Sequence, residues 1–169
     1  MKLFYILLTS LLLLSNANGG KNLFDGKTLK GWNGDPKFWS VQNGSIVGQT
    51  TKENPTKGNT FIIWKGGKMN DFDLTLDYKI EAGNSGIQYR SFVKPGKNDG
   101  WRIGGYQADL EAGDKFSGIC YGEGFRGILS MRGEKTVLTL DGKGKLKKDI
   151  KKFGDSAEIG KAVKKGKWN

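Results

Sequence analysis

The sequence of 169 residues contains no histidine, one cysteine and three prolines. Without histidine, a serine–histidine catalytic triad and the usual histidine-bearing zinc sites are excluded. Cys120 has no second cysteine for an intrachain disulfide and no histidine to activate it as a nucleophile. We therefore expect Cys120 to be a small packed side chain, and any general base to be a carboxylate or a metal-assisted group.

A membrane-spanning run is also lacking, because the apolar stretch from Leu3 to Leu14 is shorter than the roughly 20 residues that a spanning helix needs. Lys2 precedes this stretch and the small residues Ser15-Asn16-Ala17 follow it, which is typical of a secretory signal. We predict that residues 1–20 form a cleaved signal peptide. The mature chain would then be exported, periplasmic or extracellular, with no stable membrane anchor.

Acidic residues are few relative to basic ones, so the formal net charge is +11. Ten lysines lie between Lys143 and Lys167, against three carboxylates. Such a run is typical of a solvated insertion, and its lysines do not alternate with aromatic residues as they do in nucleic-acid grooves. We therefore expect no nucleic-acid partner, while attraction to an acidic polysaccharide or a cell surface stays open.

Alternation of apolar and polar residues predicts an all-β protein. Phe38–Gly48 is typical of a hairpin around Asn43-Gly44, and Asp71–Ile80 gives the clearest strand. Short strands are also predicted at Thr60–Lys65 and Val137–Leu140, and a short helical turn within Asp155–Lys165.

The stretch from Asn84 to Arg132 combines strand-like residues with polar side chains at alternate positions and many glycines. Successive side chains of a strand point to opposite faces, so Gln88 and Arg90 share one face. Gln107, Asp109 and Glu111 share a face for the same reason. Glycines within strands mark bulges or bends, so we predict a curved sheet whose polar face suits a polyhydroxylated ligand.

The motifs N-S-G-I-Q-Y-R, G-Y-Q-A-D and Y-G-E-G-F-R-G-I-L, preceded by F-D-G-K-T-L-K-G-W, resemble the secreted bacterial 3-keto-disaccharide hydrolase family. Its members are also described as 3-keto-glucoside 1,2-lyase or 3-keto-2-hydroxy-glucal hydratase domains. The resemblance covers about Asn22 to Asn169 and implies a concanavalin A-like β-sandwich (jelly roll) as a single domain at 21–169. Family members continue past this point, so the resemblance predicts a chain that is truncated before the final strands.

Two kinds of glycoside chemistry can be compared for this face. Residues 107–111 resemble the E-x-D-x-E strand motif of concanavalin A-like glucanases, but the first position is Gln107, which cannot act as a nucleophilic carboxylate. This departure disfavours an ordinary retaining glycosidase. The family resemblance instead implies substrates oxidised at carbon 3, in which the ketone acidifies the proton on carbon 2. A base then eliminates the aglycone from carbon 1, and water adds to the unsaturated sugar.

This chemistry assigns candidate roles. Asp109 is the first choice for the general base, with Glu111 and Glu123 behind it; Arg90 and Arg126 are candidate donors to the enolate or to hydroxyl groups. The candidate sugar contacts are Asn84, Gln88, Gln107, Tyr121 and Trp101. No cofactor is evident, although a divalent metal could stabilise the enolate, with no ligand cluster to show which residues would hold it.

Structural interpretations stay open for several of these residues. Asn84 could cap a tight turn, Arg90 and Asp109 could form an ion pair across the sheet, and Glu111 could lie in a loop. Arg126 and Arg132 could simply be solvated. Trp101 could be a sugar platform or core. For the whole chain, the alternative function is a non-catalytic carbohydrate-binding module or an inactive fragment, since a sandwich fold does not fix function. The oligomeric state is undetermined.

Overall fold

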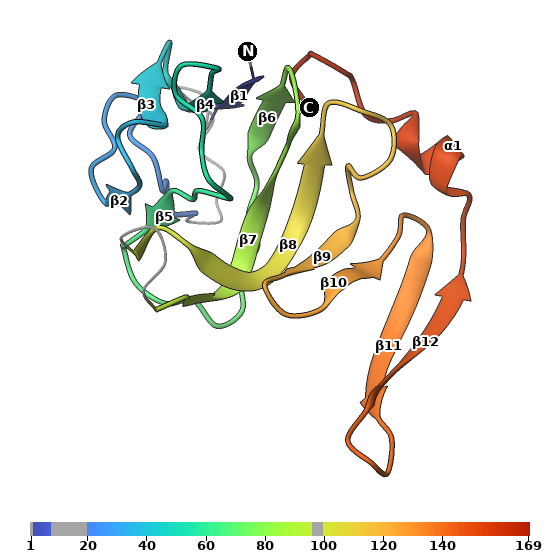
Figure 1. The fold of residues 1–169 in the computed structure, drawn as a ribbon. Helices are drawn as coiled ribbons and strands as arrows, with labels where there is room; N and C mark the ends of the chain where they lie inside the picture. The colour runs from blue at the N-terminus through green and yellow to red at the C-terminus, as the bar shows by residue number, and fades with distance from the viewer. Residues whose placement is uncertain (1, 8–19, 96–99) are drawn as a thin grey trace. The chain divides into compact units, whose positions relative to one another are not determined.

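The computed structural model describes residues 2–7, 20–95 and 100–169. Strands predominate and the only helix among the described residues is α1 (Ser156–Gly160), which confirms the all-β prediction. No helix in these ranges is long and apolar enough to cross a membrane. The chain divides into two compact units (Figure 1): Met1–Ala82 with Val93–Arg102 and Gly166–Asn169, and Gly83–Phe92 with Ile103–Lys165. The jelly-roll arrangement stays a prediction.

The first unit contains a four-stranded sheet. Its strands, in order across the sheet, are β3 (Trp39–Gln42), β4 (Ser45–Thr50), β1 (Lys2–Leu7) and β6 (Asp77–Ile80). A separate pair is formed by β2 (Trp32–Asn33) and β5 (Ile63–Trp64). The buried core of this unit includes Ile46, Val47 and Ile80, each with at most 3% of its surface exposed.

The hairpin predicted around Asn43-Gly44 is confirmed. β3 and β4 pair up to Gln42↔Ser45, which leaves Asn43 and Gly44 as a two-residue loop. Both have positive φ, 48° and 74°, as a type I′ turn requires. The local sequence was sufficient here because the turn type depends only on these two residues.

Strand β1 lies between β4 and β6 and pairs antiparallel with both, with Tyr5 opposite Val47 and Lys79. It falls within residues 1–20, whose cleavage as a signal peptide stays a prediction. The predicted cleavage region at residues 15–17 lies outside the described residues. Removal of β1 would leave the facing backbone groups of β4 and β6 without their ladder partners.

The strand predicted over Asp71–Ile80 is wrong for its first six residues. Only Asp77–Ile80 forms a strand, β6, and Phe72 and Leu74 are each 42% exposed. β6 pairs with β1 alone among the described strands, and that pairing ends at Leu7↔Asp77. Alternation therefore placed Ile80 in the core correctly, but it could not reveal that, within the described ranges, no strand pairs with residues 71–76. Similarly, only Ile63–Trp64 of the predicted Thr60–Lys65 strand is paired.

The second unit contains the predicted central strands. They form one sheet in the order β10 (Gly127–Ser130), β9 (Cys120–Glu123), β8 (Ile103–Glu111) and β7 (Asn84–Val93), the last residue of which is assigned to the first unit. β8, β9 and β10 are antiparallel, with an irregularity between Ile128 and Ser130. β8 bends along its length (Figure 1).

The lysine-rich segment is more structured than a solvated insertion. β11 (Glu134–Leu140) pairs in full with β12 (Leu146–Lys152), a strand that the sequence did not predict because only Leu146 and Ile150 in it are apolar. The predicted helical turn is confirmed as α1, whose first amides bond to Asp155.

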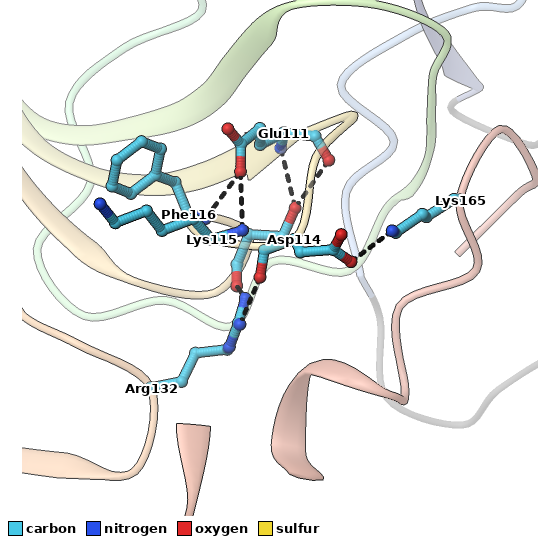
Figure 2. A network of polar contacts seen from close by, with 7 residues as sticks. Glu111, Asp114, Lys115, Phe116, Arg132 and Lys165 are labelled. Atoms are coloured by element: carbon cyan, nitrogen blue, oxygen red, sulfur yellow. Dashed lines mark hydrogen bonds and ion pairs between the residues drawn. The ribbon is translucent and has the colours of Figure 1, made fainter. Parts of the chain in front are cut away.

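Arg132 is buried and joins the loop after β8, as Figure 2 shows, to the start of α1. Its guanidinium donates to the backbone carbonyls of Asp114 at 2.6 Å, Ser117 at 2.7 Å and Ser156 at 2.9 Å. The interpretation of Arg132 as solvated is therefore wrong. The loop after β8 and the start of α1 both depend on this side chain.

We expect Arg132→Met to lower the free energy of unfolding by about 3 kcal/mol, because it leaves three carbonyl groups without their charged donor. Arg126→Met is the matched control, since Arg126 is exposed and should change stability by less than about 0.5 kcal/mol. Urea denaturation of both variants measures the difference. Equal midpoints would show that the three bonds of Arg132 contribute nothing to stability.

Candidate active site

One face of the β7–β10 sheet is polar. Alternation along β8 places Gln107 and Asp109 on the same face. In the ladder with β9, Gln107 lies opposite Tyr121 and Gly105 lies opposite Glu123, and directly opposed residues share a face. Two adjacent strands therefore present two carboxylates, an amide and a phenol side by side.

The opposite face is aromatic. The rings of Tyr89 and Tyr106 stack with centroids 5.9 Å apart, and Phe125 meets Tyr106 edge-on at 5.5 Å. The Tyr89 hydroxyl lies 3.9 Å from Sγ of Cys120. Cys120 is thus packed among tyrosines on the face away from the carboxylates. Because Tyr89 points to this face, alternation along β7 places Gln88 on the polar one.

At Gly86, β7 lies close against the Gln107 side chain of β8. A β-carbon added at Gly86 would lie only 2.5 Å from Cγ of Gln107 and 2.8 Å from the carbonyl oxygen of Ala108. Any larger residue would have to displace Gln107 or the β8 backbone. The glycine therefore allows the side chain of Gln107 to lie against β7, and Gln107 in turn donates a hydrogen bond from Nε2 to Oδ1 of Asp109.

Asp109 is a buried carboxylic acid, with 5% of its surface exposed. Burial raises its pKa above the ordinary value of 3.8, because the charged form loses hydration. The negative charges of Glu111 and Glu123 raise this pKa further, whereas the hydrogen bond from Gln107 lowers it. The group is therefore a stronger base than an exposed aspartate.

The other two acidic candidates differ from each other. Glu123, on β9, is 6% exposed and lies with Asp109 on the polar face. Glu111, at the end of β8, accepts hydrogen bonds at Oε2 from the backbone amides of Lys115 and Phe116, at 3.0 and 2.8 Å (Figure 2). Glu111 is thus the last residue of β8 and does not lie in a loop, as was the alternative, but its carboxylate holds the loop that follows. Glu123 is the better partner for Asp109.

Gln88 has an unsatisfied amide. Its side-chain nitrogen and oxygen are both buried, and neither has a hydrogen-bond partner. Buried polar groups are normally paired, since an unpaired one costs about 1–3 kcal/mol. An amide left with a free donor and a free acceptor on a polar face is suited to bind hydroxyl groups, which both accept and donate.

Arg90 and Asp109 do not form the ion pair that was considered, since the side-chain bond of Asp109 goes to Gln107. Arg90 is exposed and has φ of 47°, in the left-handed region that few residues other than glycine adopt. Such backbone strain often accompanies a functional position. At Arg90 the backbone of β7 therefore departs from regular strand geometry. The Arg90 side chain is exposed, whereas the amide of Gln88, two residues earlier, is buried.

The remaining candidates are not brought together by this sheet. Asn84 is exposed at the start of β7, and Arg126 is exposed with its guanidinium 5.4 Å from the ring centroid of Phe125. Trp101 belongs to the other unit, where its indole nitrogen donates to Oδ1 of Asn33 at 2.9 Å. Trp101 thus has a structural partner, and the sheet site contains Gln88, Gln107, Asp109, Tyr121 and Glu123.

In the described ranges, no group of three or more histidine, cysteine, aspartate or glutamate side chains is arranged to hold a metal ion. Sequence reasoning missed two contributors to this region, Gly86 as the residue that makes space for Gln107 and Arg132 as the support of the loop after β8. No sequence signal identifies Arg132, because its partners are backbone carbonyl groups. A glycine inside the N-S-G-I-Q strand pattern was the available signal for Gly86.

Known proteins similar to this chain point to one kind of chemistry. A family model described as 3-keto-alpha-glucoside-1,2-lyase-like domain matches residues 19–169. A 3-keto-disaccharide hydrolase of Bacteroides thetaiotaomicron is 35% identical over 92 residues, which cover 47% of this chain and 30% of that protein. The matched part thus spans less than a third of the relative's length. No solved structure matches the chain.

We expect Asp109→Asn to stabilise the protein at neutral pH. Below pH 3.8 the carboxyl is protonated in both folded and unfolded chains, so the variant and the wild type should be equally stable. As pH rises toward the raised folded-state pKa, the unfolded chain loses its proton more readily and the wild type loses stability relative to the variant, by about 1.4 kcal/mol for each pH unit between the unfolded-state and folded-state pKa.

Urea denaturation between pH 3.5 and 8 checks this dependence. Asp149→Asn, at an exposed aspartate on β12, is the control for the loss of one carboxyl group from the surface. A constant difference between Asp109→Asn and wild type across the range would contradict a raised pKa at Asp109.

Proposed function

Because the chain belongs to the 3-keto-alpha-glucoside-1,2-lyase-like domain family, as the match over residues 19–169 shows, we propose that it cleaves 3-keto-glycosides. The reaction is elimination of the aglycone across carbons 1 and 2, followed by hydration, which gives net hydrolysis. The observation that carries this proposal is the buried carboxyl of Asp109, whose pKa is raised by burial and by neighbouring carboxylates. The name of the Bacteroides thetaiotaomicron relative supports the same substrate class.

The chemistry follows from the ketone at carbon 3. Asp109, in its ionised form, removes the proton from carbon 2, and the electron pair is delocalised onto the ketone oxygen as an enolate. Collapse of the enolate forms the double bond between carbons 1 and 2 and breaks the bond from carbon 1 to the aglycone oxygen. Water then adds across this double bond to give the free 3-keto sugar. A base of raised pKa suits this reaction because proton removal from carbon is the difficult step.

The neighbouring groups have supporting roles. Glu123, buried on the same face, is the candidate acid that protonates the departing oxygen. Gln107 orients Asp109 through its hydrogen bond. The Gln88 amide, which has no partner in the protein, is the candidate contact for a sugar hydroxyl, and Arg90 and Arg126 are the candidate cations for the enolate oxygen.

We also propose the finer features that the resemblance implies. These are a concanavalin A-like jelly roll, supported by two antiparallel four-stranded sheets, and export to the periplasm or beyond, supported by the leader pattern in residues 1–20. The partner is then a glycoside or 3-keto-sugar substrate.

We expect Asp109→Asn to lower the turnover number by at least about 100-fold, because a carboxamide cannot accept the proton from carbon 2. Binding of a 3-keto-glucoside should change little, since the amide oxygen can still accept the hydrogen bond from Gln107. Release of aglycone from a 3-keto-glucoside measures turnover, and calorimetric titration measures binding.

Asp149→Asn serves as the control and should retain full turnover. Unchanged turnover of Asp109→Asn would exclude Asp109 as the base. If the wild type binds the 3-keto-glucoside and never releases the aglycone, the chain is a carbohydrate-binding module and the proposal fails.

A further inference from the structure

The hairpin of β11 and β12 extends away from the four-stranded sheet of its own unit (Figure 1). Its strands pair with each other and with no other strand among the described residues. Three apolar side chains on it are widely exposed, Val137 by 47%, Leu140 by 67% and Ile150 by 49%, and Phe153, directly after β12, is 73% exposed. A protruding two-stranded ribbon with exposed apolar side chains is marginal on its own in water and is typical of an interaction site.

The hairpin is also strongly basic. Residues 134–153 contain seven lysines and three carboxylates. Two of these carboxylates bond to backbone amides: Glu134 accepts from Met131 at 3.0 Å, and Asp141 accepts within the turn. Within the part of the chain that the structure describes, no ion pair joins a hairpin lysine to a carboxylate. The positive charge of the hairpin is therefore not neutralised by its neighbours.

The tip of the hairpin, residues 140–146, has both an exposed apolar side chain and positive charge. Leu140 and Leu146 are opposite each other at the end of the ladder, and Lys143 and Lys145 lie in the turn between them. Oδ1 of Asp141 accepts hydrogen bonds from the amides of Lys143 at 2.9 Å and Lys145 at 2.8 Å, which fixes the turn. Two exposed lysines are thereby held in the turn that follows Leu140, the most exposed leucine of the hairpin.

We propose that this tip docks on an anionic lipid bilayer, with Leu140 entering the headgroup layer and Lys143 and Lys145 binding lipid phosphates. Charge complementarity selects an anionic surface, and exposed Leu140 selects one with an apolar interior. An acidic polysaccharide would use the lysines alone. One leucine and a few lysines support reversible contact rather than anchoring. This inference does not depend on the catalytic proposal.

The experiment is co-sedimentation of the full chain with vesicles of phosphatidylglycerol and phosphatidylcholine, or of phosphatidylcholine alone, at low and physiological salt. We expect at least tenfold tighter binding to the anionic vesicles, weakened by salt. Lys143→Gln/Lys145→Gln should reduce that binding about tenfold and Leu140→Thr several-fold. Binding to neutral vesicles should be the same for every variant.

Two controls match these changes elsewhere on the surface. Lys27→Gln/Lys30→Gln removes the same charge at exposed positions, and Leu74→Thr changes a leucine that is 42% exposed. Neither should alter binding by more than about twofold, because both lie outside the tip.

Three results would overturn the proposal. One is equal affinity for anionic and neutral vesicles. Another is an unaltered affinity of Leu140→Thr beside a weakened lysine variant, which would indicate contact through charge alone, as with an acidic polymer. The last is an equal loss in the control lysine pair, which would show that only net charge matters.

Discussion

The carboxyl group of Asp109 is buried near other acidic groups, and the surrounding structure has to offset the free-energy cost of removing it from water. Removing a carboxylate from water is unfavourable unless it is hydrogen-bonded or protonated. Here one hydrogen bond from Gln107 offsets part of the penalty, and the rest is seen as a raised pKa. The space for Gln107 exists because residue 86 is glycine. The hydrogen bond that Asp109 receives thus depends on the absence of a side chain at residue 86 of the adjacent strand.

The two faces of the β7–β10 sheet have different roles: one packs, and the other carries the candidate site. Stacked tyrosines, with Cys120 beside them, pack one face, so that the strands are held in register without any disulfide. The polar face can then retain an amide with no partner and two buried carboxylates, which a packing face would not tolerate. At the end of β8, the carboxylate of Glu111 and the guanidinium of Arg132 hold the loop through backbone groups (Figure 2). The loop next to the site is therefore held by Glu111 and Arg132, in addition to the packing of the aromatic face.

The sequence was sufficient to predict the features that depend only on residues close together in the chain. The hairpin at Asn43-Gly44 and the shared face of Gln107 and Asp109 follow from turn chemistry and strand alternation. The strand over residues 71–76 failed because pairing needs a partner far away in the chain. The interpretation of Arg132 as solvated was wrong for a similar reason, since its hydrogen-bond partners are carbonyl groups of residues distant in sequence. The chemical roles came from the resemblance of four motifs to a family, not from spacing.

The measurement that tests the central claim most directly is the fate of the hydrogen on carbon 2 of the substrate. A 3-keto-glucoside is converted by the protein in heavy water, and the released sugar is examined by mass spectrometry and proton NMR, beside a sample of the free 3-keto sugar incubated without protein. Elimination and hydration through Asp109 predicts one solvent deuteron on carbon 2 of every product molecule, above the level of the protein-free sample. A product that retains its original hydrogen on carbon 2 would show direct displacement at carbon 1 and contradict the account.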